Sequence, residues 1–409
     1  MMKYLHFAKE KLNALTTSGN LRTLMSLSHN GIHIEHKGKT CINLASNDYL
    51  GLSAEFQQQG TQLSFEGFRA FLDSINEHIY FSASSSRLLS GDFMVFSYAE
   101  NLIANAYNTH IANKEATKEC LLFNSGYSAN VSLIESLNKL GSVLFLLDEF
   151  SHASIFDGIK LSGARFRRFT HNDMEELHNL LRINHNDYDM LIIVSEGLFS
   201  MEGDMIDSKI FTLKNSYENV LLYVDEAHSV GALGKEGLGI ISQYEKLHEV
   251  DFLLLTFGKA IGSIGACVLC AKEMKSYFIN FARSLIYSTA LPPINVAFSA
   301  YIFSLLKDFE DKRVYLDSIS KQTKTYLSEI FGQERVLGEA YIISLLLGEN
   351  QKALRVSELL ESMGIFAPCI RYPTVPKGSA RIRFSLNAGL KKQHLNTLLN
   401  TLNDIKGQV

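Results

Sequence analysis

The sequence lacks the features that mark several classes of protein. Its 39 basic and 43 acidic residues leave a net charge of −4, and the basic residues are scattered, so nothing favours a nucleic-acid partner. The first ten residues lack the unbroken apolar run of a signal peptide. No apolar run is followed by GxGxxG or by a Walker A motif, which argues against a nucleotide-dependent enzyme. We therefore expect a cytoplasmic protein.

An uninterrupted membrane-spanning run is also missing. The longest apolar stretch, residues 250–271, reaches spanning length, but charged residues and glycines divide it into two strand-length pieces (Asp251, Lys259; Gly258, Gly262, Gly265). A metal-binding cysteine set is missing as well. Cys267 and Cys270 form a CxxC inside a strand-like run, and no second pair completes a zinc site. We expect no membrane insertion and no metal.

What the sequence does contain is a repeated alternation of short apolar runs and helix-length amphipathic segments. The runs cover residues 120–123, 143–147, 190–194, 220–224, 252–255 and 266–269, and most end in polar or glycine-containing loops. Strands apolar on both faces that alternate with helices predict an α/β fold with a mainly parallel, covered sheet. Ligands bind such sheets at the carboxyl ends of the strands, so the polar residues there should converge.

The alternation stops after Pro293. A long amphipathic helix is expected over residues 294–330, strands over 341–347 and 381–386, and helices near 350–363 and 391–405. The first 55 or so residues read as a separate arm with a helix, a turn at Asn30-Gly31 and a short strand. We therefore predict an N-terminal arm (1–55), a large domain (56–293) and a smaller C-terminal α+β domain (294–409).

Lys259 and Asp225 carry the strongest chemical signal. Each follows an apolar run, so both are expected at neighbouring strand ends. A lysine there can hold the aldehyde of pyridoxal phosphate (PLP) as a Schiff base, and an aspartate can pair with its pyridinium nitrogen. This pair predicts a PLP enzyme that stabilises a carbanion on an amino acid.

Other strand ends carry weaker candidates. Gly126 and Tyr127 open a helix after a strand, where backbone N–H groups can seat a phosphate, although an ordinary strand-to-helix turn looks the same. His152 could stack on the cofactor ring, and a lone histidine is more often a capping or core residue. His228 could donate to the cofactor's phenolic oxygen, and Ser200 could add a polar contact. Together, on successive strand ends, these residues reinforce the PLP prediction.

The chain resembles the α-oxoamine synthase family of fold-type I PLP enzymes, in unbroken order from about residue 20 to 400. The segments that carry the resemblance lie at 46–52, 86–91, 148–154, 168–173, 196–204, 224–228, 256–266, 282–289 and 371–376. Three of them, Arg-Leu-Leu-Ser-Gly, Ala-Arg-Ser-Leu-Ile-Tyr-Ser-Thr and Pro-Thr-Val-Pro, are most similar to the branch that serves biotin biosynthesis. The resemblance implies a large domain with a mainly parallel seven-stranded sheet covered by helices.

The resemblance also implies an activity: condensation of L-alanine with a pimeloyl thioester, carried by CoA or a carrier protein, with loss of CO2. It places Lys259, Asp225 and His152 in catalysis, with Lys259 also as general base. Cofactor contacts are implied for Gly126, Tyr127, His152, Ser200, Asp225, His228, Thr256 and Lys259, and for Tyr287 and Thr289 from the second subunit of a homodimer. Substrate contacts are implied for Arg22, Asn47, His152, Arg371, Thr374 and Arg383.

The sequence departs from the family pattern at three places without touching Lys259 or Asp225. Four serines and Ala83 occupy residues 82–86 where a glycine-rich run is usual, Tyr127 stands where phenylalanine is common, and Glu149-Phe150 replaces a more basic pair. The serine-rich loop leaves the acyl preference open. Sister enzymes that use glycine or serine with another acyl-CoA, and a PLP-binding scaffold without catalysis, remain the alternatives.

Overall fold

In the computed structural model of the chain, residues 3–58 and 60–409 are described. Contacts divide the chain into two compact units, Asn47–Asp317 and Met1–Ser46 with Ser318–Val409. The limits differ from the three predicted segments because β3 (Lys39–Asn43) pairs in parallel with β13 (Ile365–Phe366). The first strands of the chain therefore share a unit with its C-terminal third. No described helix is both long and apolar enough to cross a membrane.

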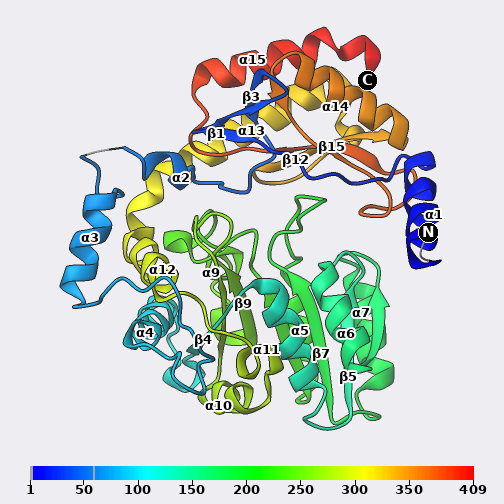
Figure 1. Cartoon of the computed structure of the whole chain (residues 1–409). Coiled ribbons are helices and arrows are strands. Elements are labelled where there is room, and N and C mark those ends of the chain that lie inside the picture. The colour runs from blue at the N-terminus through cyan, green and yellow to red at the C-terminus, as the bar shows by residue number, and fades with distance from the viewer. Residues whose placement is uncertain (1–2, 59) are drawn as a thin grey trace. The chain divides into compact units, whose positions relative to one another are not determined.

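The larger unit is built on a seven-stranded sheet in the order β4-β10-β9-β8-β7-β5-β6 (Figure 1). Its strands are β4 (Glu119–Phe123), β5 (Val143–Asp148), β6 (Arg165–Phe169), β7 (Met190–Glu196), β8 (Val220–Asp225), β9 (Phe252–Thr256) and β10 (Ala266–Cys270). Strand β10 runs in the opposite direction to the other strands of this sheet. The predicted α/β class and mainly parallel sheet are confirmed.

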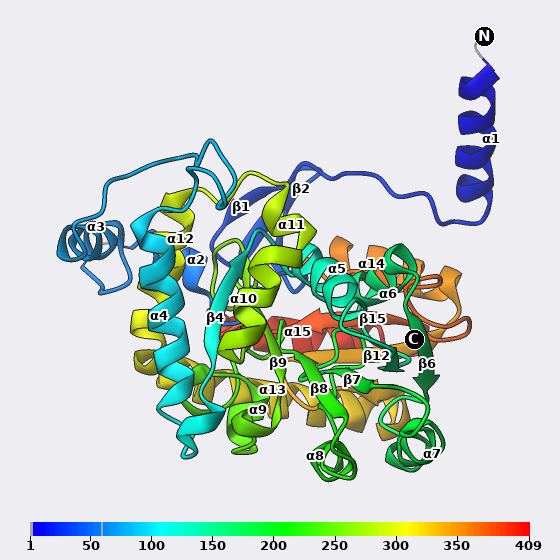
Figure 2. The same cartoon turned by 90° about the horizontal axis from the view of Figure 1, so that it is seen from below.

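Alternate side chains of these strands face a single apolar layer of helices. Phe145 and Leu147 of β5, Ile192 and Val194 of β7 and Leu254 of β9 belong to one buried cluster, as period-two alternation requires. Its helices are α5 (Gly126–Leu137), α6 (Ala153–Ser162), α10 (Lys272–Phe281) and α11 (Arg283–Ile286) (Figure 2). Burial of this layer fixes the sheet and hence the positions of its strand ends.

The larger unit contains further helices outside this layer. They are α2 (Leu52–Glu55), α3 (Phe65–Ser74), α4 (Met94–Asn108), α7 (Met174–Asn184), α8 (Lys209–Lys214), α9 (Ile240–Gln243) and α12 (Pro293–Leu305). Of these, α4 packs on β4 and on α12, and α8 contacts β8. The expected single helix over 294–330 is interrupted: a 3-10 turn, Leu306–Phe309, separates α12 from α13 (Glu310–Phe331).

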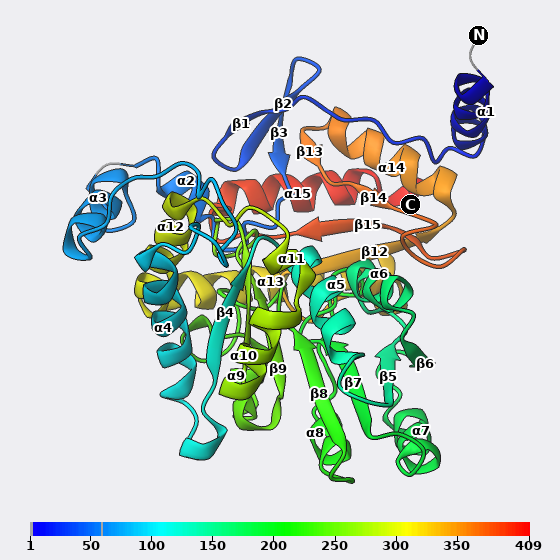
Figure 3. The same ribbon diagram turned by 60° about the horizontal axis from the view of Figure 1, so that its bottom comes forward.

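The smaller unit contains two four-stranded sheets, β1-β2-β3-β13 and the antiparallel β11-β12-β15-β14. Its helix α14 (Asn350–Ser362) packs on β12 (Ile342–Gly348), β14 (Cys369–Ile370) and β15 (Ala380–Ser385) (Figure 3). Its other elements are α1 (Lys3–Thr17), β1 (Ser28–Asn30), β2 (His33–His36), β11 (Val336–Leu337) and α15 (Lys392–Asp404). Strands and helices both form this unit, which makes it α+β.

Candidate active site

A cavity of about 260 Å³ opens where the carboxyl ends of the parallel strands of the larger unit meet. Eight residues predicted from the sequence line it: Asn47, Gly126, Tyr127, His152, Asp225, His228, Thr256 and Lys259. They come from five different loops that span more than two hundred residues of chain. The strand ends of the sheet bring seven of them together, and Asn47 joins them from the segment between β3 and α2.

Lys259 lies in a tight turn directly after β9. The backbone N–H of Gly262 donates to the Lys259 carbonyl at 2.8 Å, and the N–H of Ser263 donates to the Phe257 carbonyl at 2.8 Å. Gly262 has a φ of 65°, a left-handed conformation that glycine adopts without strain. These backbone hydrogen bonds define the turn that places Lys259 at the cavity wall.

Asp225 ends β8 and is 4% exposed, so its charge needs close partners. Its Oδ1 accepts the backbone N–H of Ala227 at 2.9 Å, and its Oδ2 accepts the side-chain N–H of Asn130 at 2.9 Å. These two hydrogen bonds hold the Asp225 carboxyl in place. An anion in this position is what a pyridinium nitrogen requires.

His152 is the N-terminal cap of α6. Its Nδ1 accepts the backbone N–H of Ser154 at 3.2 Å and lies 2.7 Å from the Ser154 hydroxyl. An Nδ1 that accepts carries no proton, so the neutral ring is protonated at Nε2. Burial lowers the pKa of His152, with the Lys259 charge acting in the same direction and Asp225 opposing it. The ring is thus a neutral, flat surface at the cavity.

Glu196 lies beside Asp225 because the two residues pair in register at the ends of β7 and β8. It is 3% exposed and lines the cavity, and its Oε1 has no hydrogen-bond partner among residues 3–58 and 60–409. Burial first, and the Asp225 charge second, raise the pKa of Glu196 well above its usual value. The raised pKa favours the neutral form of Glu196, beside an Asp225 carboxyl that accepts two N–H donors.

Gly126 and Thr256 form a close wall between the start of α5 and the end of β9. A Cβ placed on Gly126 would lie 2.5 Å from Cγ2 of Thr256, so no other residue fits without a shift. The preceding Ser125 caps α5 by accepting the Ser128 N–H at 3.1 Å. The first two residues of the helix, Gly126 and Tyr127, line the cavity, and first-turn N–H groups have no acceptor within a helix. The N–H groups fit the phosphate of pyridoxal phosphate, Lys259 fits its aldehyde, and Asp225 fits its ring nitrogen.

Three residues predicted to contact the cofactor do not line this cavity. Ser200 lies in the hairpin that follows β7, and Tyr287 and Thr289 lie after α11. Tyr287 is 72% exposed, and the Thr289 carbonyl accepts a hydrogen bond from the Asn124 side chain at 2.7 Å. Within one copy of the larger unit, these residues are not brought to Lys259.

Four residues predicted to contact substrate belong to the smaller unit, and three of them share a pocket. Arg22, Arg371 and Thr374 line a pocket of about 140 Å³. Arg383 is buried in β15, and Arg381 lies two residues away on the same face of the strand. Two predicted substrate residues, Asn47 and His152, line the larger unit's cavity.

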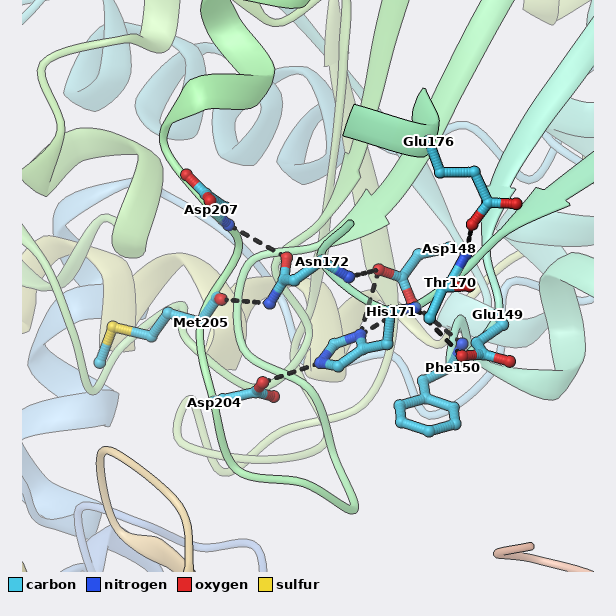
Figure 4. Close-up of polar contacts among 10 residues, drawn as sticks. All are labelled: Asp148, Glu149, Phe150, Thr170, His171, Asn172, Glu176, Asp204, Met205 and Asp207. Carbon is cyan, nitrogen blue, oxygen red and sulfur yellow. Dashed lines mark hydrogen bonds and ion pairs between the residues drawn. The ribbon is translucent and has the colours of Figure 1, made fainter. Parts of the chain in front are cut away.

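His171 connects the strand ends that support the cavity (Figure 4). Its Nδ1 donates to Asp148 at 2.9 Å and its Nε2 donates to Asp204 at 2.7 Å. The ring packs against Phe150 and edge-on against Phe199, with centroids 4.7 and 4.4 Å away. Asp148 begins the turn that leads to His152, and Asp204 closes the hairpin that carries Ser200, so His171 ties these two segments together.

Two bonds to carboxylates keep the His171 ring charged. Burial alone acts against the charge, but the hydrogen bonds to Asp148 and Asp204 outweigh it and raise the pKa of His171 to about 10. A raised folded-state pKa contributes stability that is fully present below pH 6.5, the ordinary pKa of histidine, and is lost as the pH rises through about 10.

We expect His171→Gln to lower the thermal unfolding midpoint, most strongly below pH 6.5 and less as the pH approaches 10. Allowing for solvent screening, the loss below pH 6.5 should correspond to about 2 kcal/mol of unfolding free energy. Thermal melts of the cofactor-free protein across this range measure the effect. The control is His185→Gln, because that ring stacks on Tyr217 and its Nδ1 bonds the Arg182 carbonyl. If the difference in unfolding midpoint between His171→Gln and the wild-type protein stayed constant from pH 6 to pH 10, the His171 ring would not be charged.

The structure adds site residues that the sequence argument did not select. Ser154 and Glu196 line the cavity, as does Asn130, while Tyr49 places its hydroxyl 2.7 Å from Nδ1 of His228. Serine, asparagine and tyrosine are common and carry no spacing signal. Glu196 stands at a strand end, which was the only available signal.

Comparison with known proteins agrees with this geometry. Residues 39–402 match the family described as aminotransferase class I and II. An 8-amino-7-oxononanoate synthase of Haemophilus ducreyi is 39% identical over 397 residues, covering 96% of this chain and 99% of that protein. A Glaesserella parasuis protein that bears the same name in provisional form is 41% identical over 394 residues, covering 96% of this chain and 99% of its own.

Solved structures show the same fold. The 8-amino-7-oxononanoate synthase of Francisella tularensis is 26% identical with a TM-score of 0.70, covering 89% of this chain and 97% of that one. A PLP-containing serine palmitoyltransferase from S. paucimobilis is 23% identical with a TM-score of 0.84, covering 100% of both chains, a likeness of fold. The chain therefore belongs to the aminotransferase class I and II family and, within it, to the α-oxoamine synthases, which depend on pyridoxal phosphate.

Proposed function

We propose that the protein condenses L-alanine with a pimeloyl thioester to give 8-amino-7-oxononanoate, CO2 and the free thiol, in the cytoplasm and as a step of biotin biosynthesis. The observation that carries the proposal is near full-length identity of about 40% to proteins named for this reaction. A cavity with Lys259, Asp225 and His152 on its wall supports it.

The residues of the larger unit supply the proton chemistry. When bound, pyridoxal phosphate withdraws electrons from the amino-acid Cα. Lys259 holds the cofactor, removes the Cα proton of alanine and returns a proton after CO2 has left. Asp225 keeps the ring nitrogen protonated through its buried negative charge. His152 covers the ring with a neutral face, His228 contacts the phenolic oxygen, and Gly126, Tyr127 and Thr256 seat the ring and phosphate.

Substrate recognition falls, in this proposal, to Asn47 and to the basic residues of the smaller unit. A guanidinium fork matches a carboxylate with two parallel hydrogen bonds, so Arg371 or Arg383 would bind the carboxylate of alanine. Arg22 and Thr374, which share a pocket with Arg371, would lie on the acyl side. CoA or an acyl carrier protein would present the pimeloyl group, and the reaction is the same with either.

We also propose a homodimer that completes the site. Tyr287 and Thr289 would reach the phosphate of the second subunit, which accounts for their position outside their own cavity. Several large apolar side chains at residues 79–94 are exposed in the single chain, and Phe81, Leu89 and Met94 are 81–82% exposed, as expected of an interface. Ser200 would add its contact from the hairpin after β7.

The test is amino-acid selectivity read from the visible absorbance of the PLP-bound protein. We expect L-alanine to change the spectrum at lower concentration than glycine or L-serine, because the proposal assigns alanine as the substrate. A response to glycine or serine in preference to alanine would move the protein to a sister reaction of the same family. No response to any of the three, with PLP bound, would favour a scaffold without catalysis.

A further inference from the structure

Asn130 stands at the centre of a buried polar chain beside the cavity. It lies on α5, is 1% exposed and lines the cavity. Its Nδ2 is 2.9 Å from Oδ2 of Asp225 and 3.0 Å from Oγ of Ser154, and its Oδ1 is 2.6 Å from the hydroxyl of Tyr223. Both amide donors and the amide oxygen are therefore engaged.

The partners fix which way this amide faces. A carboxylate only accepts hydrogen bonds, so the atom of Asn130 that faces Asp225 is the nitrogen. The oxygen then faces Tyr223, whose hydroxyl donates. Tyr223 is fully buried on β8, two residues before Asp225, so its ring cannot move without disturbing the sheet. Tyr223 thereby holds the amide in one orientation.

The hydrogen bonds that lead from Asn130 to His152 all run in one direction, from donor to acceptor. One N–H of Asn130 donates to the Ser154 hydroxyl, and that hydroxyl donates to Nδ1 of His152 at 2.7 Å. Ser154 is fully buried, so no solvent offers its hydroxyl another partner. With its oxygen accepting from Asn130, the Ser154 proton is directed at Nδ1, and the His152 proton is left on Nε2.

We propose that Asn130 is a positioning residue for both faces of the cofactor: it holds the Asp225 carboxylate for the ring nitrogen and, through Ser154, fixes the orientation and tautomer of His152. One amide group thus couples two residues that approach from different strand ends, β8 and the turn after β5. The inference rests on the PLP cofactor and is independent of the amino acid and acyl group in the proposed reaction.

The structural alternative is that Asn130 fills a buried gap and satisfies polar neighbours. Any such role would be expressed in the stability of the cofactor-free fold. A positioning role is expressed in the bound cofactor itself, because the charge on Asp225 sets the protonation of the ring. The two roles are separated by measuring PLP affinity and the pH dependence of PLP absorbance, without substrate.

The test compares Asn130→Asp with Asn138→Asp. Asn138 ends the same helix and donates from Nδ2 to the Ser162 carbonyl, so the control also replaces an amide donor by a carboxylate, away from the cavity. Asn130→Asp puts a second carboxylate against Asp225 and removes the donor to Ser154. We expect it to weaken PLP binding at least about 10-fold and to shift the midpoint of the absorbance titration by about one pH unit. Asn138→Asp should change neither.

Two milder variants keep the test decisive if Asn130→Asp does not fold. Tyr223→Phe frees the amide to rotate, and we expect a shift of the titration in the same direction, with roughly 3-fold weaker PLP binding. Ser154→Ala removes the hydroxyl that links Asn130 to His152 and leaves the hydrogen bond from Asn130 to Asp225. The midpoint of the absorbance titration should therefore stay unchanged, and PLP binding should weaken only slightly. Wild-type affinity and midpoint in Asn130→Asp, or in Tyr223→Phe where the first variant is unfolded, overturn the proposal.

Discussion

Lys259→Ala should lose covalent attachment of PLP and at least about 10³-fold of its turnover. Lys259 is the lysine that lines the cavity of the larger unit, on a turn fixed by two backbone hydrogen bonds. Alanine keeps the turn and removes both the amine that bonds the aldehyde and the base that takes the Cα proton. Borohydride reduction followed by mass spectrometry of tryptic peptides locates the cofactor in the wild-type protein and detects its loss in the variant.

Lys272→Ala is the matched control, because Lys272 is exposed at the start of α10. It should retain both the reduced cofactor and the activity. Appreciable turnover by Lys259→Ala, or a reduced cofactor found on another lysine, would show that the assignment of Lys259 is wrong.

Asp225→Asn should lower kcat about 10²–10³-fold while PLP still binds. The variant keeps the size and the bond from the Ala227 N–H but removes the negative charge. Without that charge the ring nitrogen loses its proton near neutral pH, and the ring withdraws electrons from the substrate less strongly. The visible absorbance of the bound cofactor, titrated against pH, should show the changed protonation directly.

Asp73→Asn, a change of the same type on the exposed face of α3, serves as the control. It should leave the titration and kcat unchanged. A wild-type kcat in Asp225→Asn would mean that another group, such as Glu196 beside it in register, carries the charge.

The strand ends were the predictable part of the site, for a physical reason. Ser125, His152, Asp225 and Thr256 stand after runs that are apolar on both faces, and parallel strands end at one edge of a sheet. Strand β6 shows where the pattern fails. Its sequence Arg-Phe-Arg-Arg-Phe lies at the sheet edge with exposed arginines, so it has no apolar run to detect, and only the family resemblance implied a seventh strand.

The polar chain behind the site was not predictable from the sequence. Asn130 reaches Asp225, 95 residues away, and His171 reaches Asp204, 33 residues away, and such pairings have no local signature. The break between α12 and α13 was also missed, because the buried Leu306 and Phe309 continue the amphipathic pattern across it. Long-range hydrogen bonds depend on the completed fold, whereas strands depend on nearby residues.

The most direct measurement is the product itself. The purified, PLP-loaded protein is incubated with L-alanine and pimeloyl-CoA, and in parallel with glycine or L-serine, and the products are identified by mass spectrometry. We predict 8-amino-7-oxononanoate, with one CO2 and one free CoA released per molecule, from L-alanine and little from the other two amino acids. A product from glycine or serine in preference to alanine, or CoA release without any amino-ketone, would contradict the proposed reaction.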